Sequence, residues 1–353
     1  MNKFLHLFLL FVLLASSPSA VFAFETDQFN LPPEPLADIG AEVYEYVREN
    51  VETAMTKINA EISQRRKCLE NGKLNDCDSP QENRQRLAYL QSPAAIERAV
   101  YQKLGAGFPP FTTSGSWMDS HRFQAQPARY KTTRKASIYA TAPINYLTIS
   151  PTVNLYGAQF GTDKIAHIFQ QGYTYLRMYQ RAKAQGLSNE AAAKRACDWG
   201  RMSERTFYGN LVSGVYSNAD LAANFAGLKF YQNLTAPILI GAETKSPLVV
   251  LENGAWQFNP KINLAENLLK PFVTDHLNEA MNSSIYMKFF GLRASVRSHV
   301  KKRACAEWKQ AFPNFSKTDF TQQSNRLQSW FGEDYGFTVN ENFIRIADTC
   351  FGD

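Results

Sequence analysis

The chain has 353 residues, of which 44% are hydrophobic and 20% charged, the balance of a globular protein with a substantial core. The formal net charge is +6 without an arginine-rich stripe interleaved with aromatic residues, which argues against a nucleic-acid-binding protein. This mild basic excess instead fits weak attraction to an anionic envelope lipid or a cell-wall component.

The first 23 residues have the pattern of a signal peptide. Lys3 provides a positive start, residues 4–15 are nearly all apolar, and Val21 and Ala23 place small residues at the −3 and −1 positions of a cleavage site. We therefore predict an exported protein, periplasmic or secreted, with an uncleaved anchor as the alternative. No later apolar run reaches about 18 residues, so no transmembrane span is expected in the mature chain.

Five cysteines follow the predicted signal peptide, and export permits them to form disulfides. Cys68 and Cys77 flank a turn-rich segment, which favours a local bridge, and Cys305 could be tied to Cys350. Cys197 would then be left over in an alanine-rich helix, where it is expected to be buried and inert. Because no C-x-x-C pair is present, a cysteine metal site is not expected.

Helical periodicity dominates the predicted N-terminal helical region, residues 24–104. Residues 38–67 carry apolar residues at the spacing of one long amphipathic helix. Residues 81–104 predict a second helix with a break near Pro93, since proline interrupts a helical run.

Residues 105–157 are predicted to form a loop and short strands. The first part is rich in Gly, Pro, Ser and Thr, and it holds His121, an outside candidate for a functional site. The alternative is a structural loop packed by its own aromatic residues. Residues 136–157 alternate and are rich in β-branched and aromatic residues, which predicts two or three short strands with Pro143 and Pro151 at their edges.

The rest of the chain, residues 158–353, is predicted to be a helical core domain that carries the polar motif. Residues 248–258 predict a hairpin with Asn253 and Gly254 as its turn. The expected fold class is therefore mainly α, a helical domain with a small β-rich insertion and a short hairpin. The expected helices span residues 163–185, 188–207, 217–234, 261–303 with interruptions near Pro271 and Gly291, and 319–331.

Two smaller features of this domain carry local predictions. Ser188 and Ser217 stand just before predicted helices and are good N-cap residues. Asp275, His276 and Glu279 lie close together on a predicted helix, but only the two acids share a face. We interpret these three residues as part of a solvated face.

The central helices carry polar residues at helical spacing. Asp163 and His167 lie four residues apart, as do Asp220 and Asn224, so each pair shares one face of an otherwise apolar helix. Such helices face a core, where buried polar groups need partners. The simplest arrangement places these four residues and Glu204 around one shared site on facing helices.

These residue types suit two kinds of chemistry. Asp163, His167 and Asp220 can ligate a divalent metal ion such as Zn, Mn or Mg. The same groups and Glu204 can instead transfer protons, with Asn224 orienting a neighbour or a substrate oxygen. Taken singly, each residue also has an ordinary role as a helix cap, an ion-pair partner or a hydrogen-bonded core histidine. The five residues are therefore candidate catalytic residues, and the sequence leaves open whether the protein is an enzyme.

The order of these residues resembles the pattern of the VanZ-like superfamily, which includes small envelope proteins and lipoprotein relatives. The shared pattern is D-K-x-x-H starting at Asp163, a later Glu204, and S-x-x-D-L-x-A-N-x-x-G from Ser217 to Gly227. The resemblance covers 65 of the 353 residues and implies a helical protein that acts at the cell envelope. One branch is tied to glycopeptide resistance, but the helices here carry too many charges to span a bilayer as that branch does.

We predict an exported, envelope-associated protein with a helix-borne polar site. One hypothesis is a metal-dependent or acid–base hydrolase that acts on a lipid- or cell-wall-linked substrate. The alternative is a non-catalytic envelope binding or structural protein whose polar cluster is a buried hydrogen-bond network. A secreted effector that acts on other cells is a third hypothesis.

Overall fold

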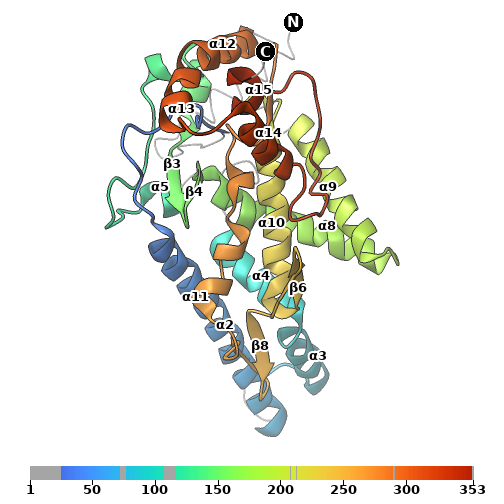
Figure 1. The fold of residues 1–353 in the computed structure, drawn as a ribbon. Helices are drawn as coiled ribbons and strands as arrows, with labels where there is room; N and C mark the ends of the chain where they lie inside the picture. The colour runs from blue at the N-terminus through green and yellow to red at the C-terminus, as the bar shows by residue number, and fades with distance from the viewer. Residues whose placement is uncertain are drawn as a thin grey trace, which may run out of the picture.

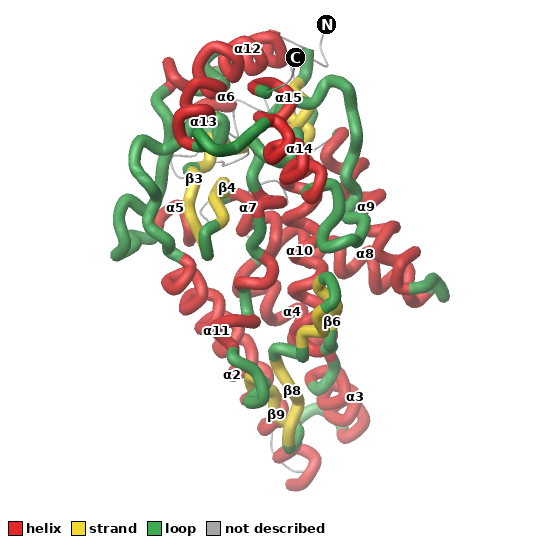
Figure 2. Tube along the Cα trace, viewed as in Figure 1, coloured by secondary structure: helices red, strands yellow, loops and turns green. Residues whose placement is uncertain are grey.

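The computed structural model describes residues 25–71, 77–106, 117–206, 208–211, 213–288 and 291–351 (Figure 1). The predicted signal peptide, residues 1–23, lies outside these described residues. Within them the protein is mainly helical, and its strands form only two-stranded sheets (Figure 2). The mainly α fold class is therefore confirmed.

The N-terminal region consists of one long helix and two shorter helices that pack against it. The long helix α2 (Gly40–Asn71) buries an apolar stripe and packs against α3 (Pro80–Leu90) and α4 (Pro93–Leu104). The predicted break is confirmed, because α3 ends before Pro93 and α4 begins with it. Proline suits the first turn of a helix, where the missing N–H has no partner to lose.

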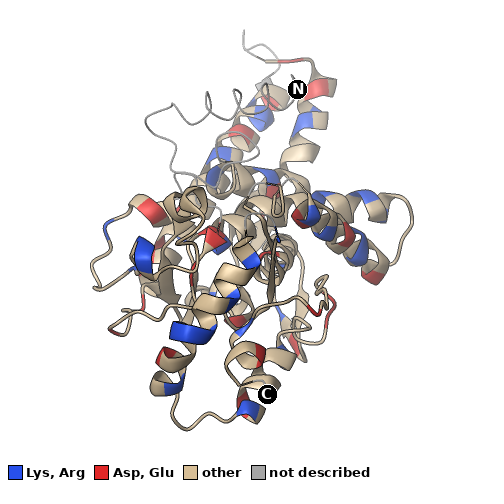
Figure 3. Cartoon of the chain, turned by 90° about the horizontal axis from the view of Figure 1, so that it is seen from above, with Lys and Arg blue, Asp and Glu red and all other residues tan. Residues whose placement is uncertain are grey.

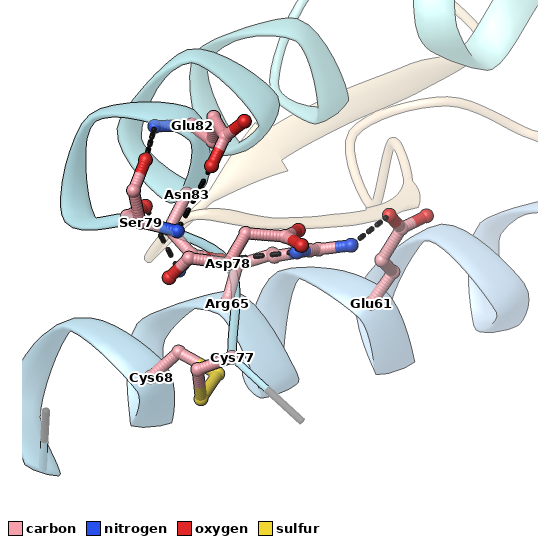
Figure 4. The surroundings of a disulfide bond; sticks show 8 residues. All are labelled: Glu61, Arg65, Cys68, Cys77, Asp78, Ser79, Glu82 and Asn83. Atoms are coloured by element: carbon pink, nitrogen blue, oxygen red, sulfur yellow. Dashed lines mark hydrogen bonds and ion pairs between the residues drawn. A yellow bond between two sulfur atoms is a disulfide. The ribbon is translucent and has the colours of Figure 1, made fainter. Parts of the chain in front are cut away.

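The connection from α2 to α3 is closed by the predicted disulfide between Cys68 and Cys77 (Figure 4). Beside it, Arg65 forms ion pairs with Glu61 and Asp78. A capping box, in which the side chains of Ser79 and Glu82 accept each other's backbone N–H, starts α3.

The predicted hairpin is confirmed and lies against the C-terminal half of α2. Strands β8 (Val249–Glu252) and β9 (Ala255–Phe258) pair antiparallel across a two-residue turn. Asn253 and Gly254 in that turn have φ angles of +50° and +72°, which tight hairpin turns of this length require. A second hairpin, β6 (Ile238–Ile240) with β7 (Glu243–Lys245), was not predicted.

The strand-rich insertion differs in part from the prediction. Strands β2 (Ile149–Ser150) and β3 (Thr152–Leu155) fall inside it, and β3 pairs with β4 (Ala158–Gly161) just beyond it. Strand β2 pairs in parallel with β1 (Glu25–Thr26), which lies at the start of the described chain.

The two described strands of the insertion begin only at Ile149, and its first part forms turns and one short helix instead of a strand. Residues Pro143–Leu147 form the short helix α6, and Arg134–Ala136 form a 3₁₀ turn. Pro143 begins a helical turn rather than bordering a strand, because its fixed φ suits the first turn of a helix. In the preceding loop, Trp117–Ser120 form the short helix α5.

The central helices follow the prediction closely. The first is continuous, with α7 (Asp163–Ala166), a π-helical turn η2 (His167–Gln171) and α8 (Gly172–Ala184). It is followed by α9 (Asn189–Arg205) and by α10 (Asn218–Thr235), which runs through the middle of the molecule and is buried on almost every side (Figure 1).

Both serines predicted as N-caps act as caps. The Ser188 side chain accepts a hydrogen bond from the backbone N–H of Ala191, and the Ser217 side chain accepts one from Asp220. Ser217 ends strand β5 (Val215–Ser217), so the chain enters α10 directly from a strand.

The predicted long helix over residues 261–303 is wrong in its first thirty or so residues. That segment contains α11 (Leu264–Asn267), 3₁₀ turns at Lys270–Phe272 and Asp275–Leu277, and strand β10 (Ser284–Tyr286), which pairs antiparallel with β5. Polar side chains bind the backbone that a helix would need. Asn278 accepts hydrogen bonds from the backbone N–H groups of two following residues, which holds a turn in place of a helix.

The C-terminal part forms a second helical layer, at the top of Figure 1. The predicted disulfide joins Cys305 to Cys350, the last residue of the last described helix, and Cys197 is free and buried as expected. Among the described residues no helix is both long and apolar enough to cross a membrane. The elements are α12 (Leu292–His299), the π-helical turn η6 (Val300–Ala304), α13 (Cys305–Ala311), α14 (Lys317–Arg326) and α15 (Ile346–Cys350).

Two apolar cores fill the protein, and charged groups lie over its surface and between the cores. The larger core joins α2, α4, α8 and α10, and the smaller joins β10 with α12 to α15. Seen from above, basic and acidic residues are both spread over the outer helices (Figure 3). Ile165 belongs to the larger core and Ala280 to the smaller, so their charged neighbours Lys164 and Glu279 lie where the two cores meet.

We expect His276 to penalise the folded state in acid. Its pKa is lowered because burial disfavours the imidazolium, while hydrogen bonding to Ser329 O only partly opposes this. Below its ordinary pKa of 6.5 the unfolded chain therefore binds a proton that the folded chain does not, and stability falls. As the pH falls from about 7.5 to about 5.5, the wild type should lose free energy of unfolding that His276→Gln keeps. Urea denaturation of both proteins across this pH range measures the difference. Parallel pH profiles of the two proteins would contradict this.

Candidate functional site

Two central helices come into backbone contact just after the polar residues. The helix formed by α7, η2 and α8 meets α10 where Gly172 lies against Gly227. A Cβ atom on Gly227 would lie 2.7 Å from the Gly172 Cα and still closer to the carbonyl oxygen of Ile168. The absence of side chains at this contact allows the preceding turns of both helices to face each other across a short distance.

Lys164 is the centre of the site, surrounded by three carboxylates. Its Nζ lies 2.5 Å from Asp163 Oδ2, 2.6 Å from Asp220 Oδ1 and 2.5 Å from Glu279 Oε1. The side chains of Lys164, Asp163 and Glu279 have no exposed surface. Burial alone would lower the pKa of Lys164, but the surrounding acids outweigh burial and raise it, so the side chain remains an ammonium.

Two further acids, Glu25 and Glu204, are buried beside this group. Burial raises the pKa of Glu25 well above its ordinary value, and Glu279 and Asp220 raise it further. Burial likewise raises the pKa of Glu204, with Asp220 as the next cause. Burial and Asp220 also raise the pKa of Glu279, to about 8 although Lys164 lowers it. These three acids therefore hold protons near neutral pH, and the charge of Lys164 is shared mainly by Asp163 and Asp220.

His167 forms the edge of the cluster, with a side chain 10% exposed where that of Asp220 is 4% exposed. Its Nδ1 donates a hydrogen bond of 2.9 Å to Asn224 Oδ1, because an amide oxygen can only accept. In the neutral imidazole Nε2 then carries a lone pair. Nε2 lies 3.6 Å from Asp220 Oδ2, too far for a hydrogen bond.

The structure brings four of the predicted site residues together around Lys164 and His167. Asp163 and Asp220 share Lys164, and His167 lies between Asp220 and Asn224. Glu204 is 1% exposed and joins the same buried region through its electrostatic interaction with Asp220. The sequence-based choice of these residues therefore corresponds to one place in the fold.

His121, the outside candidate, lies elsewhere. Its ring stacks on Trp117 with the ring centroids 4.0 Å apart, and its Nε2 is 3.4 Å from Glu42 Oε2. This packing matches the alternative, a structural loop held by its own aromatic residues. In the same loop, Asp119 accepts a hydrogen bond from Thr162, next to the site.

The prediction for the acids near residue 279 was wrong in its main point. Glu279 is fully buried and paired with Lys164, whereas it was expected on a solvated face; Asp275 alone of the two acids is exposed. Lys164 and Glu25 were not predicted as site residues either. A lysine placed between Asp163 and apolar residues was a signal for Lys164, but no local pattern marks Glu25 or Glu279.

The fold and this site define a mainly helical protein with a buried ion cluster at the meeting point of two helices. A scan against models of protein families finds no match, and searches for similar curated proteins and similar solved structures find none either. The resemblance to the VanZ-like superfamily therefore stays a prediction that rests on the motif residues.

Proposed function

We propose that the protein is an exported, envelope-associated hydrolase whose reactive centre is the edge of the cluster formed by His167 and Asp220. The observation that carries this proposal is the placement of His167 Nε2. This atom belongs to the most exposed of the side chains that contact Asp220, and it presents a lone pair beside a large group of buried acids. Buried acids and bases with displaced pKa values concentrate at functional sites.

The arrangement supports proton transfer from water. Asn224 fixes the tautomer of His167, so that Nε2 is the atom that takes the proton. Asp220 stabilises the imidazolium that forms, and Lys164 holds Asp220 in place. Glu204 keeps a proton in the same buried region because its pKa is raised. A base and a protonated acid in one site are the two groups that hydrolysis requires.

Two observations support the location and the substrate class. Disulfides persist in oxidising compartments, so the bridges at Cys68–Cys77 and Cys305–Cys350 favour an exported protein, periplasmic or secreted. A lipid- or cell-wall-linked substrate follows from the envelope proteins that the motif resembles and from the net charge of +6.

His167→Ala and Asp220→Asn are expected to abolish complementation of the envelope defect of a deletion strain, because removing a general base lowers the rate about 10²–10⁴-fold. The measurement is complementation at matched protein levels, together with the melting temperature of each purified variant. His121→Ala, which changes a histidine outside the site, should complement fully. Folded His167→Ala and Asp220→Asn proteins that complement as the wild type does would refute the hydrolase.

A non-catalytic binding or structural role is the second candidate, and the near-complete burial of Lys164, Asp163 and Glu279 favours it. A buried network of ion pairs and hydrogen bonds can fix the register of two helices without any chemistry. In that case Asp220→Asn should lower the free energy of unfolding by about 1–3 kcal/mol. Function should then return whenever the temperature is low enough for the variant to fold, whereas a catalytic defect persists.

A further inference from the structure

We infer that Asp163, His167 and Asp220 together bind a divalent transition-metal ion, with Zn²⁺ as the best match to one imidazole and two carboxylates. The role of this ion in hydrolysis rests on the proposed function, but its binding does not. The ion would hold and activate the attacking water, and His167 Nε2, as its ligand, would take the place in the site that the proposal above gives to a general base.

The distances between the candidate ligands fit one shared ion. One ligand atom from each of Asp163, His167 and Asp220 lies within 4.8 Å of the other two. Two ligands of a tetrahedral zinc ion, each about 2.0–2.2 Å from the metal, are separated by roughly 3.3–3.6 Å. The 3.6 Å between His167 Nε2 and Asp220 Oδ2 falls at that separation, and it is too long for a direct hydrogen bond.

The orientation of His167 is the one that metal-binding histidines adopt. Its Nδ1–H donates to Asn224 Oδ1 at 2.9 Å, which leaves Nε2 as a free ligand atom. A hydrogen bond from the second ring nitrogen to an oxygen fixes the tautomer and the ring plane of a metal ligand. Without a bound ion, the Nε2 lone pair of a neutral ring faces a carboxylate oxygen, an arrangement that gains nothing for either atom.

The two aspartates each keep an oxygen that Lys164 does not bind. Lys164 pairs with Oδ2 of Asp163 and with Oδ1 of Asp220. In the described part of the chain, Asp163 Oδ1 is buried and receives no hydrogen bond, and Asp220 Oδ2 faces His167. A buried carboxylate oxygen without a donor is costly, so a cation bound there would satisfy it.

The balance of charge also favours a cation. Five buried acids, Asp163, Asp220, Glu279, Glu25 and Glu204, interact with the single ammonium of Lys164. Only Asp163 and Asp220 share the charge of this ammonium, because the other three acids hold protons. A divalent ion beside these two aspartates would therefore be attracted by the one negative charge that Lys164 leaves uncompensated, which a low-dielectric interior screens poorly.

The local backbone and the exposure of the site suit a reactive ion. His167 begins the π-helical turn η2, and such turns inside helices occur frequently at functional sites. Three protein ligands leave a tetrahedral ion with one position for water, as in catalytic rather than structural zinc sites. His167 is the exposed edge of the cluster, so that position is the one closest to solvent.

The test is metal binding by the full processed chain, free of any histidine tag and stripped with a chelator. We expect about one Zn²⁺ per chain by elemental analysis after equilibrium dialysis. Affinity should be at least about tenfold weaker in His167→Gln and in Asn224→Ala, which removes the partner of the ligand. Two matched variants outside the site, His121→Ala and His276→Gln, should bind as the wild type does. Wild-type protein without bound Zn²⁺, or binding that His167→Gln leaves unchanged, would overturn the inference.

Cobalt gives a readout that does not depend on the variants. Co²⁺ bound by the wild type in place of Zn²⁺ should show the intense visible absorption of a tetrahedral site, and Zn²⁺ should displace it. If His167→Gln does not fold, this spectrum and a Zn²⁺-dependent rise in the wild-type melting temperature decide the question. Absence of both would overturn the metal site.

The failure of this inference and the failure of the proposed function give different results. Metal binding that depends on His167, combined with full complementation by His167→Ala, would keep the metal site and refute the hydrolase. Loss of complementation in a protein that binds no metal would refute the metal site and leave His167 as the base. Loss of Zn²⁺ binding in His167→Gln together with loss of complementation in His167→Ala supports the metal-dependent hydrolase.

Discussion

Replacing Lys164 with methionine is expected to lower the free energy of unfolding by about 3–5 kcal/mol. Methionine fills much of the lysine's volume but leaves Asp163 and Asp220, which share the charge of Lys164, without their counter-charge in a site with almost no exposed surface. An uncompensated charge in the interior is far more costly than a broken ion pair at the surface. The measurement is equilibrium denaturation of the wild type and the variant in urea or guanidinium.

The matched control is Lys270→Met, which breaks a pair of similar length at the surface. Lys270 Nζ lies 2.7 Å from Glu266, and the two side chains are 46% and 56% exposed. Its loss should cost about 0.2–1 kcal/mol, the usual value of exposed pairs. If Lys164→Met costs no more than this control, the charges around Lys164 are solvated and the cluster is not the buried site described above.

A second variant tests whether charge, and not packing, causes the loss. Adding Asp220→Asn to Lys164→Met removes one of the two aspartates that share the charge of Lys164 while keeping the shape of the side chain. The double variant should recover part of the lost stability, because residues in one ionic network are coupled. No recovery would assign the effect of Lys164→Met to packing.

The helices of the candidate site could be predicted because their signals are local. Ser217 caps α10 from three residues before Asp220, and the cap, the apolar spacing and the polar pair all lie within a few turns. The four-residue spacing then determined which side chains share a face. Asp163, His167, Asp220 and Asn224 were found from this spacing, and the resemblance of the motif to the VanZ-like pattern supported the choice.

The other half of the ion cluster could not be predicted, because it depends on contacts between distant segments. Glu25 lies in a two-residue strand whose partner starts at Ile149, and no periodicity in either segment encodes that pairing. Glu279 lies in a segment of 3₁₀ turns, where the backbone is held by side chains such as Asn278. A helical period was wrongly assigned there, and the period placed Glu279 on the solvent side.

Gly227→Ala is expected to destabilise the protein by about 1–3 kcal/mol, the usual effect of overpacking. Intrinsic preference predicts the opposite sign, because alanine is favoured over glycine inside a helix by about 0.8–1 kcal/mol. The steric clash should outweigh the helix preference, because the new methyl group would meet backbone atoms of Gly172 and Ile168, which cannot rotate away. Denaturant unfolding measures the sign directly.

Ala60→Gly calibrates the helix preference in the same protein. Ala60 is exposed in the middle of α2, so its replacement should cost about 0.5–1 kcal/mol through helix preference alone. If Gly227→Ala instead stabilises the protein by that amount, the two helices are not in backbone contact. The position of Asp220 and Asn224 relative to His167 depends on that contact, so Gly227→Ala should also weaken Zn²⁺ binding although residue 227 is not a ligand.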